Sequence, residues 1–394
     1  MNQRVSSLLL AFFALTAQAQ LPTIEKNLHQ EGDKPFFYTV AVPDGNYKVT
    51  VTLGRAKSDA ETTVRAEGRR LFVEPVKTKK GKYAIHTFTV NKRTINLPDG
   101  RQIKINAREK AYKNWDDSLS LEFNGSYPAV RSVKIEPAGK VTQLILCGNS
   151  TVTDQNYEPY ASWGQMVTRW FDPSVAVVNL AESGQTCGST IAQRRLDKAV
   201  SMLQEGDWLF VEFGHNDQKD KKPGSGAWYN FTHYLKQFVD LARQKKANIV
   251  FCTPTQRRKW EKDNLHIRET HGDYPEAMRA VAKREGVPVI ELHDMTRTFF
   301  ETLGYEDSKK SLVHYPANTF PGQTKELADD THFNPYGAYE VSKMVVMGMK
   351  QIGCSLTEHL LPDWKDFDPA HPDSFDSFQW PASPTVDTSQ PAGN

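Results

Sequence analysis

Cysteine is scarce in this sequence, with four residues in a chain of 394. Cys147, Cys187, Cys252 and Cys354 lie far apart, and no spacing between them matches a zinc site. Cys147 and Cys252 fall within apolar, strand-like runs, where a small buried thiol is the common state. We therefore expect no structural metal and at most one disulfide.

A strong charge bias and a long apolar run are also missing. The 49 lysines and arginines nearly balance the 47 acidic residues, so the formal net charge is +2. This balance excludes the broad basic field of a nucleic-acid-binding protein and an acidic tail, so any preference for polyanions must come from a local patch. No stretch reaches the ~20 apolar residues that span a bilayer. We expect a soluble protein that does not cross the membrane.

The first residues have the pattern of a targeting signal that is removed from the mature protein. Arg4 precedes the apolar run 8–15, and Ala17-Gln18-Ala19 has the small-x-small pattern that signal peptidase cleaves. The pattern predicts a signal peptide over residues 1–19 and export to the periplasm or the medium, with Gln20 as the mature amino terminus.

Residues 20–139 show an alternation of period two, interrupted by frequent turn signals. FFYTVAV, then Pro-Asp-Gly-Asn, then YKVTVTLG predicts a hairpin, and four later runs continue the series. The pattern predicts an all-β sandwich of the jelly-roll type. Trp115 and several tyrosines would either stack on sugar rings or fill the sandwich core or the domain interface. The domain is thus either a carbohydrate-binding module or a structural support.

Residues 140–361 follow a different pattern, in which short apolar runs alternate with helical segments. QLILC, VAVVNL, DWLFVEF, ANIVFC and VPVIEL predict five buried strands of a parallel sheet. Helices are expected over 190–204, 228–246 and 274–285. A last helix should begin at Asn334 as N-cap and stop at Gly353. The fold class is α/β, with a flavodoxin-like α/β/α arrangement. Residues 362–394 are rich in Pro, Asp and Ser, and we expect this tail to be partly disordered.

The loops that follow these strands carry polar residues. Gly148-Asn149-Ser150-Thr151 follows the first strand, 179–184 the second, and Gly214-His215-Asn216-Asp217 the third, while 329–333 precede the last helix. The carboxyl ends of parallel strands meet at one edge of a sheet, so these four loops should converge.

Three residues of these loops suit nucleophilic catalysis. A serine hydroxyl needs a neutral imidazole to take its proton, and His332 can play that part for Ser150. The imidazole needs a carboxylate on its other nitrogen, and Asp329 can fold back onto it across a tight loop, which selects it over Asp330. In the simpler alternative, Ser150 and Thr151 merely cap a helix.

Acyl transfer also needs donors for the negative charge that develops on the carbonyl oxygen. The backbone N–H groups of Ser150 and Gly184 and the side-chain amide of Asn216 can supply three. Gly184 has no Cβ, which lets its backbone approach the oxyanion closely.

These blocks resemble, in order, those of the SGNH (GDSL-type) hydrolases. Ser150, Gly184, Asn216 and His332 match the four residues that name the family. Within it, the nucleophile run, the Gly-His-Asn-Asp block and Asp-x-Thr-His-Phe look most like rhamnogalacturonan acetylesterases. The resemblance covers about 141–353 and implies Ser-His-Asp catalysis without a cofactor. One residue departs from it: Asn149 stands where the family usually has Asp, which is not the triad acid.

Two other site types fit less well. The residue two positions after Ser150 is not glycine, which argues against the nucleophile elbow of α/β-hydrolases. Asp329, Asp330 and His332 offer too few ligands in one place for a hydrolytic metal site.

Candidate substrate contacts surround this edge of the predicted sheet. Lys219 and Lys221 follow the Asn216 block, and a basic loop there would attract a uronate-containing chain or would simply be solvated. Aromatic residues at the rim would stack on sugars, and His215 would contact substrate. The full candidate set is Tyr157, His215, Lys219, Lys221, Trp228 and Trp260. Trp163, in an apolar helical pattern, is expected in the core.

The sequence therefore predicts an exported carbohydrate O-acetylesterase that acts on acetylated pectin, above all the rhamnogalacturonan backbone. The lack of an apolar segment for an acyl-chain groove favours a short acyl group over a lipid. Two alternatives remain open: an acetylesterase for xylan, another polysaccharide or a small ester, and a carbohydrate-binding protein without catalysis.

Overall fold

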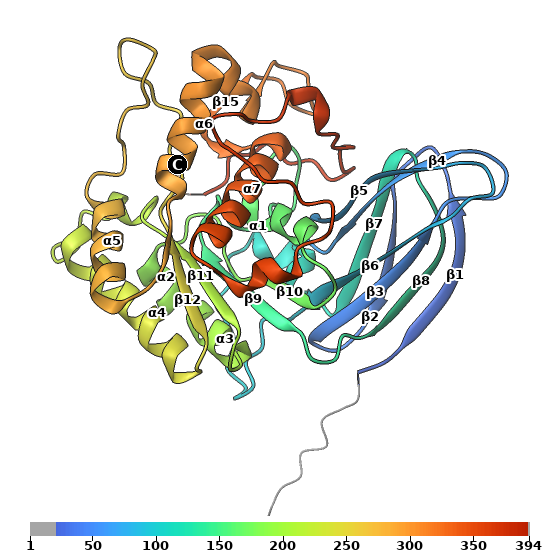
Figure 1. Ribbon diagram of the computed structural model, residues 1–394, viewed down its shortest axis with the longest axis horizontal. Helices are drawn as coiled ribbons and strands as arrows, with labels where there is room; N and C mark the ends of the chain where they lie inside the picture. Colours follow the sequence, from blue (N-terminus) through green and yellow to red (C-terminus); the bar gives the residue numbers. More distant parts are fainter. Residues whose placement is uncertain (1–20, 393–394) are drawn as a thin grey trace, which may run out of the picture.

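The computed structural model of the protein describes residues 21–392. These residues form two lobes side by side, an all-β lobe and an α/β lobe (Figure 1). The predicted signal peptide, 1–19, lies outside the described residues. No helix among residues 21–392 has the length and apolar character needed to cross a bilayer.

The all-β lobe is a sandwich of two four-stranded antiparallel sheets, with strand orders β1-β8-β3-β6 and β2-β7-β4-β5. Buried and partly exposed residues alternate along β3, whereas β4 and β7 are buried along most of their length, and a separate apolar core lies between the sheets. The strands are β1 (Ile24–Glu31), β2 (Phe36–Ala41), β3 (Gly45–Leu53), β4 (Ala60–Ala66), β5 (Arg70–Thr78), β6 (Ala84–Lys92), β7 (Ser118–Tyr127) and β8 (Ala129–Pro137).

The α/β lobe is built on a parallel sheet of five strands in the order β10-β9-β11-β12-β13. In chain order this is 2-1-3-4-5, the flavodoxin-like arrangement, so the fold class predicted from the sequence is confirmed. Each strand coincides with an apolar run identified in the sequence. The runs are continuous because helices cover both faces of the strand, so neither face carries a row of polar residues. The strands are β9 (Thr142–Gly148), β10 (Val175–Asn179), β11 (Trp208–Glu212), β12 (Asn248–Cys252) and β13 (Val289–Ile290).

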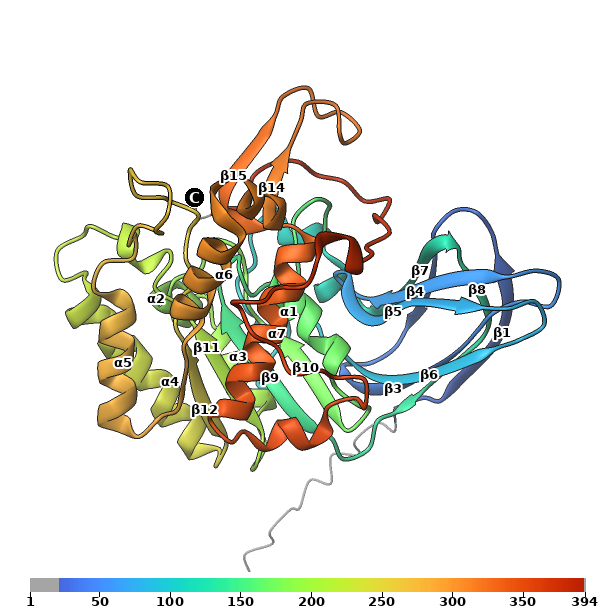
Figure 2. The same cartoon turned by 45° about the horizontal axis from the view of Figure 1, so that its top comes forward.

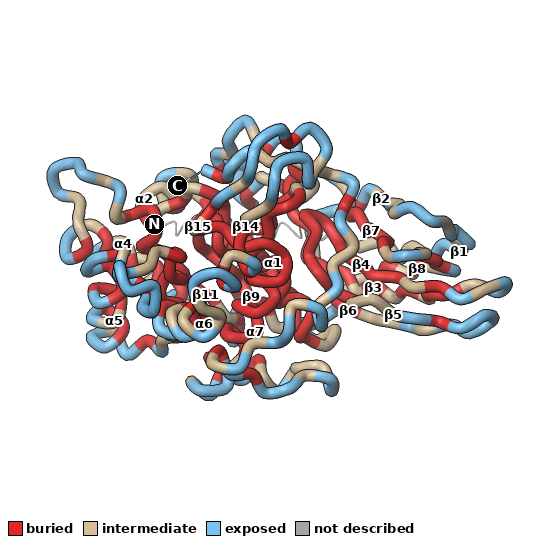
Figure 3. The backbone as a smooth tube through the Cα atoms, turned by 90° about the horizontal axis from the view of Figure 1, so that it is seen from above, coloured by how far each residue is buried: buried red, intermediate tan, exposed pale blue. Residues whose placement is uncertain are grey.

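Helices cover both faces of this sheet, which gives three layers (Figure 2). Leu144 and Leu146 face one apolar core with α1, α6 and α7, whereas Ile145 and Cys147 face the other with α3, α4 and α5. The buried residues run continuously through the sheet and the helices beside it (Figure 3). The helices are α1 (Trp163–Met166), α2 (Cys187–Ala192), α3 (Arg195–Met202), α4 (Thr232–Gln244), α5 (Tyr274–Glu285), α6 (Leu292–Asp307) and α7 (Pro335–Gln351).

The helix predictions were correct in part. The range 274–285 coincides with α5, but the single helix expected over 190–204 is wrong. It divides into α2 and α3 because Arg194 adopts a left-handed conformation with φ of 63°. The helix expected from residue 228 begins with a π-helical turn, Ala227–Phe231, before α4.

The last helix begins as its sequence signals indicated. The side chain of Asn334 accepts a hydrogen bond from the Gly337 N–H across 3.0 Å, and Pro335 occupies the first turn. Just before it, β14 (Leu312–Tyr315) and β15 (Leu327–Phe333) form a two-stranded antiparallel ribbon. The residues expected in a loop, 329–333, therefore lie on a strand.

Arginines of the sandwich lobe reach into the α/β lobe. Arg69 contacts Glu158 with 2.6 Å between Nη2 and Oε1, and both side chains are buried. Arg70 lies 3.5 Å from the carboxylate of Asp154, also within the buried interface. Trp115 is buried too, with the guanidinium of Arg93 4.8 Å from its ring, so it fills the interface and is no open platform for sugars.

The tail, which was predicted to be partly disordered, lies against the body of the protein over residues 362–392. Its aromatic side chains have apolar partners: Phe378 stacks on Tyr339, with 4.3 Å between ring centroids. The Trp380 ring lies under the guanidinium of Arg65 at 3.5 Å. Composition indicated a polar tail, but a few aromatic anchors suffice to dock it. All four cysteines are buried thiols.

Candidate active site

Ser150, His332 and Asp329 lie in one hydrogen-bonded row. Ser150 follows the end of β9 at the carboxyl edge of the sheet, between the ends of β10 and β11. At this position the order in which successive strands are added to the sheet reverses, which is where such sheets bind ligands. Its hydroxyl donates to Nε2 of His332 across 2.9 Å, and Nδ1 of His332 donates to Oδ2 of Asp329 across 2.7 Å. This row has the contacts that a serine needs to lose its proton to an imidazole.

The carboxylate of Asp329 is held by its own strand. Its Oδ1 accepts hydrogen bonds from the backbone N–H groups of Thr331 and His332 across 2.8 and 3.0 Å. Burial alone would raise the pKa of Asp329, but the hydrogen bond and charge of His332 outweigh it and lower the pKa to about 2. Asp330 instead pairs with Arg258, 3.1 Å away, and Lys259. The geometry therefore separates the two neighbouring acids as the sequence argument did.

The three expected oxyanion donors lie on the loops that follow β9, β10 and β11. Within residues 21–392, neither the Ser150 N–H nor the Gly184 N–H donates to another protein group. Gly184 has φ of 80°, a conformation that favours glycine. The Asn216 amide donates one N–H to the Gln185 carbonyl across 3.1 Å, which orients the group and leaves its second N–H for a ligand.

Asn149 stabilises the turn that carries Ser150. Its Oδ1 accepts from the Thr151 backbone N–H across 3.0 Å and lies 2.9 Å from the Thr151 hydroxyl, contacts that an Asp oxygen would also make. Its Nδ2 is buried without a partner in the described part of the chain. An unpaired buried donor of this kind typically costs about 1–3 kcal/mol. The departure from the family pattern thus affects stability at this loop more than its shape.

Glu212 lies beneath this turn. Its Oε1 is 2.6 Å from the Thr151 hydroxyl, and its Oε2 accepts from the Trp163 indole N–H across 2.6 Å. Burial raises the pKa of Glu212 to about 7. Thr151 has one hydroxyl hydrogen for two acceptors, so a proton on Glu212 completes the chain from Glu212 through Thr151 to Asn149.

Replacing Glu212 with glutamine is expected to flatten the dependence of stability on pH. In the unfolded chain Glu212 loses its proton near pH 4.5, whereas the folded protein keeps it to about pH 7. The unfolded state then binds fewer protons, so the free energy of unfolding falls as pH rises through this window, by at most about 1.4 kcal/mol per unit from this group. Glutamine removes that contribution while its amide donates to Thr151.

Urea denaturation of both proteins between pH 5 and 8 measures this effect. Glu205→Gln is the matched control, because Glu205 is exposed and pairs only with an exposed lysine, Lys246. An unchanged slope in Glu212→Gln would show that Glu212 is ionised throughout.

The candidate substrate residues near Asn216 are placed differently from one another. Lys219 Nζ donates to the Asn216 side-chain oxygen across 3.2 Å, so Lys219 adjoins the oxyanion group. Lys221 is exposed and donates to the carbonyl of Gln218 in its own loop. His215 is fully buried, and Tyr157 packs edge-on against Tyr112. Of these residues, the geometry ties Lys219 and His215 most directly to the site.

The two candidate tryptophans also differ. Trp228 is 49% exposed, and its indole N–H donates to Asp273 across 3.0 Å, which leaves a ring face open to solvent. Trp260 instead packs against the apolar core and meets the Tyr305 ring edge-on at 5.9 Å. Trp260 is therefore not an open stacking surface, and Trp163 lies in the core as expected.

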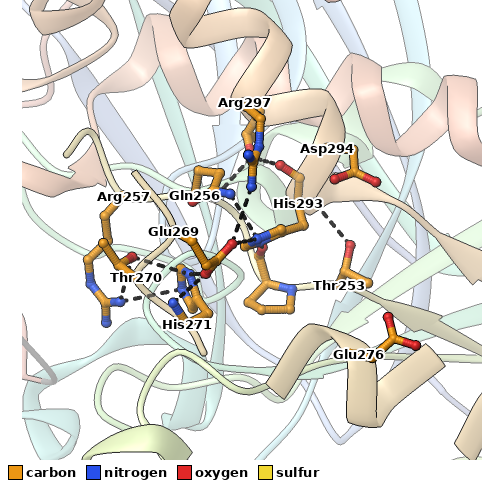
Figure 4. A network of polar contacts seen from close by, with 12 residues as sticks. Thr253, Gln256, Arg257, Glu269, Thr270, His271, Glu276, His293, Asp294 and Arg297 are labelled. Carbon is orange, nitrogen blue, oxygen red and sulfur yellow. Dashed lines mark hydrogen bonds and ion pairs between the residues drawn. The ribbon is translucent and has the colours of Figure 1, made fainter. Parts of the chain in front are cut away.

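Glu269, His271 and His293 belong to a polar network that the sequence did not reveal (Figure 4). His271 Nε2 is 3.0 Å from His215 Nδ1, and His293 Nε2 is 2.7 Å from Glu269 Oε2. Nδ1 of His293 lies 2.8 Å from the Pro254 carbonyl, and its Nε2 also lies 2.8 Å from the Gln256 amide nitrogen.

Glu269, His271 and His293 also offer ligand atoms within 4.8 Å of one another, a donor set that zinc accepts. However, Arg297 donates to Glu269 across 3.2 Å, and Arg257 lies 3.5 Å from His271 Nε2. Two guanidinium groups would repel a dication here. We therefore interpret the group as an ionic network that supports His215 and Arg257.

Three further residues at the site carry no sequence motif. The Gln155 side chain donates to the Ser150 carbonyl across 3.0 Å, and the buried Tyr160 ring meets His332 edge-on at 5.8 Å. Gln390, from the tail, donates to Oδ2 of Asp329 across 2.9 Å. Gln155 and Tyr160 lie on the segment that follows Ser150, whereas only the tertiary fold brings Gln390 to this site.

Comparison with known proteins matches the same loops. The GDSL-like Lipase/Acylhydrolase family model covers residues 146–338. The chain is 39% identical over 224 residues to rhamnogalacturonan acetylesterase RhgT of Bacillus subtilis (strain 168). The aligned region covers 56% of this chain and 95% of that protein. It is 30% identical to the probable rhamnogalacturonan acetylesterase YesY of the same organism, over 56% and 98%. Among solved structures, a Bacillus subtilis protein of 21% identity covers 84% of this chain and 89% of its own, with a TM-score of 0.49.

Proposed function

Because the chain belongs to the GDSL-like lipase/acylhydrolase family, we propose that it is a rhamnogalacturonan acetylesterase with Ser150 as its nucleophile. Family membership makes the chain a carboxylic-ester hydrolase, and the activities of its relatives make it a carbohydrate acetylesterase. To this carbohydrate acetylesterase activity we add the polymer, rhamnogalacturonan, and the catalytic residues, Ser150, His332 and Asp329. The observation that carries it is the row from Ser150 through His332 to Asp329, beside backbone N–H groups without an acceptor in the described chain.

The geometry supports a two-step reaction. The Ser150 oxygen attacks the acetyl carbonyl carbon as its proton passes to Nε2 of His332, and the N–H groups of Ser150 and Gly184 and the Asn216 amide hold the negative oxygen. His332 then gives the proton to the departing sugar oxygen, which leaves an acetyl group on Ser150. Water attacks this ester with His332 as base, and acetate departs as Ser150 regains its proton. Asp329 stabilises the imidazolium in both steps.

Positive charge beside the oxyanion group supports an acidic polymer as substrate. Arg257 donates to the His215 carbonyl across 3.0 Å, and Lys219 donates to the neighbouring Asn216. Arg257 contacts a carbonyl, a hydroxyl and an imidazole, and none of these groups neutralises its charge. Burial and the charge of Arg257 lower the pKa of Lys219 to about 8, as expected for two cations held close together. A galacturonate carboxylate would relieve their repulsion.

Acetate release from a panel of polymers tests the proposal. We expect the highest kcat/KM on acetylated rhamnogalacturonan, and lower values on acetylated xylan and on a small neutral acetyl ester. A preference for xylan would support the alternative polysaccharide. No acetate from any substrate, together with no labelling of Ser150 by a fluorophosphonate probe, would support a carbohydrate-binding protein without catalysis.

Replacing Arg257 with glutamine is expected to raise KM for acetylated rhamnogalacturonan by about tenfold, the equivalent of about 1.4 kcal/mol of lost binding. KM for acetylated xylan, which offers no backbone carboxylate, should change much less. Lys222→Gln removes the same charge from an exposed loop position and serves as the control. An equal rise in KM on both polymers would contradict a carboxylate contact.

We also propose that the protein is exported, since polymeric pectin is met outside the cytoplasm. The support is the signal pattern in residues 1–19, which lie outside the described part. Amino-terminal sequencing of the mature protein should begin at Gln20. A retained Met1 would contradict export by this route.

A further inference from the structure

The C-terminal segment 378–392, here called the strap, is anchored firmly on the sandwich lobe. The Asn124 amide donates to the Ala382 carbonyl across 3.0 Å, and the buried Ser383 hydroxyl donates to Glu122 across 3.2 Å. Arg65 donates to the Pro381 carbonyl and places its guanidinium over the Trp380 ring. These contacts combine hydrogen bonds to charged groups with a cation–π contact, so this part should stay in place.

The strap next pairs with Glu158, which lies in the loop between Ser150 and α1. Glu158 Oε1 accepts from the Trp380 indole N–H across 2.8 Å and from the Ser383 N–H across 2.9 Å. Glu158 also forms a parallel β-bridge with Val386, with backbone hydrogen bonds of 2.9 Å to Thr385 and 3.0 Å from Asp387. Asp387 is therefore the last strap residue within 21–392 that a backbone hydrogen bond ties to the body.

The strap's tip, residues 388–392, crosses the active site with far fewer ties. Among residues 21–392, its polar contact with the body is the Gln390 amide on Oδ2 of Asp329, at 2.9 Å. Ala392 lies over Gly184, where a side-chain carbon added to the glycine would come within 3.1 Å of the Ala392 Cβ. The tip thus spans from the triad acid to the oxyanion glycine.

This placement closes the site to a polymer. Ser150 is 1% exposed and His332 is 1% exposed, yet an acetyl group on a sugar must reach the Ser150 oxygen. Within residues 21–392 the tip is the part of this cover with the fewest ties, because one hydrogen bond, the buried Pro391 and the contact of Ala392 with Gly184 hold it, whereas many hydrogen bonds hold the anchor. Segments with few such ties open locally at low cost in free energy.

We propose that residues 388–392 are a tethered lid that closes the active site and that the polysaccharide displaces, with the anchor at 380–387 as its fixed end. The inference rests on the proposed function, since it takes Ser150 as the nucleophile. When the lid is closed in a fraction of molecules, the apparent affinity for the polymer falls by the open fraction. A lid closed in about 67–90% of molecules gives an effect of about 3- to 10-fold.

The test compares the full chain with a variant that ends at Asp387. Removing the tip is expected to lower KM for acetylated rhamnogalacturonan by about 3- to 10-fold and to speed the labelling of Ser150 by a bulky fluorophosphonate. Gln390→Ala should act in the same direction with a smaller effect. Ser389→Ala is the matched control, because this exposed serine bonds only to Asp387 within the tip region.

Unchanged or higher KM and unchanged labelling in both the shortened chain and Gln390→Ala would overturn the lid. A fall in kcat with unchanged labelling would also overturn it, because the tip would then be a fixed wall of the site. These outcomes are distinct from failure of the proposed function, which would appear as full activity of a Ser150→Ala protein.

Discussion

Replacing Ser150 with alanine is expected to lower kcat for acetate release by about 10⁴-fold or more, with little change in stability. The hydroxyl is the one group in the row that can bond to the acetyl carbon, and loss of a nucleophile in a triad removes the covalent route entirely. The change deletes one oxygen from a buried position and leaves the backbone N–H groups in place. Residual turnover would then come from the oxyanion donors alone.

The measurement is acetate release from acetylated rhamnogalacturonan, with thermal unfolding to show that the variant is folded. His332→Ala should cost a similar factor, and the double variant little more, since residues that act as a unit are not additive. Thr153→Ala is a control of equal size, because its buried hydroxyl bonds only the Ala181 carbonyl. Activity within tenfold of the parent would rule out Ser150 as nucleophile.

The sheet and its loops were predictable because their signals are local. Each strand of the parallel sheet is a short apolar run. Ser150, Gly184 and Asn216 each follow one of these runs, and His332 precedes the last helix. Parallel strands force their carboxyl ends together, so the convergence of the loops followed from the strand pattern. Local signals also set the start of α7, where the Asn334 cap and the following proline act over one turn.

The rest depends on contacts that no local pattern carries. Gln390 meets Asp329 across 61 positions, and the only hint of docking was a set of aromatics in a polar tail. The break at Arg194 lies in a segment whose apolar spacing suits one helix. His215, His271 and His293 lie apart in sequence and no motif links them, yet the fold buries them together.

The sandwich lobe contributes to the site through its buried arginines. Arg69 pairs with Glu158 and donates to the carbonyls of Gln155 and Tyr160 across 3.1 and 3.0 Å. Gln155 in turn holds the Ser150 carbonyl, so the lobe supports the loop that carries the nucleophile. This arrangement favours a structural support over a separate carbohydrate-binding module for residues 20–139.

Arg69→Met is therefore expected to lower the free energy of unfolding by about 3–5 kcal/mol, the range for breaking a buried ion pair at one partner. Methionine fills part of the space but leaves the Glu158 carboxylate buried without its cation. Two carbonyls also lose their donor. Urea denaturation measures the change, and kcat should fall with it because the Ser150 loop loses its support.

The exposed pair of Lys48 and Glu136, 3.0 Å apart, provides the control, since Lys48→Met should cost no more than about 1 kcal/mol. A double-mutant cycle with Glu158→Gln separates the pair from the two carbonyl contacts: if the pair dominates, the second change costs much less in the Arg69→Met background. A loss below about 1 kcal/mol for Arg69→Met would mean that burying the two charges offsets their attraction. The sandwich lobe would then hold the nucleophile loop through its apolar contacts, and the case for a binding module would reopen.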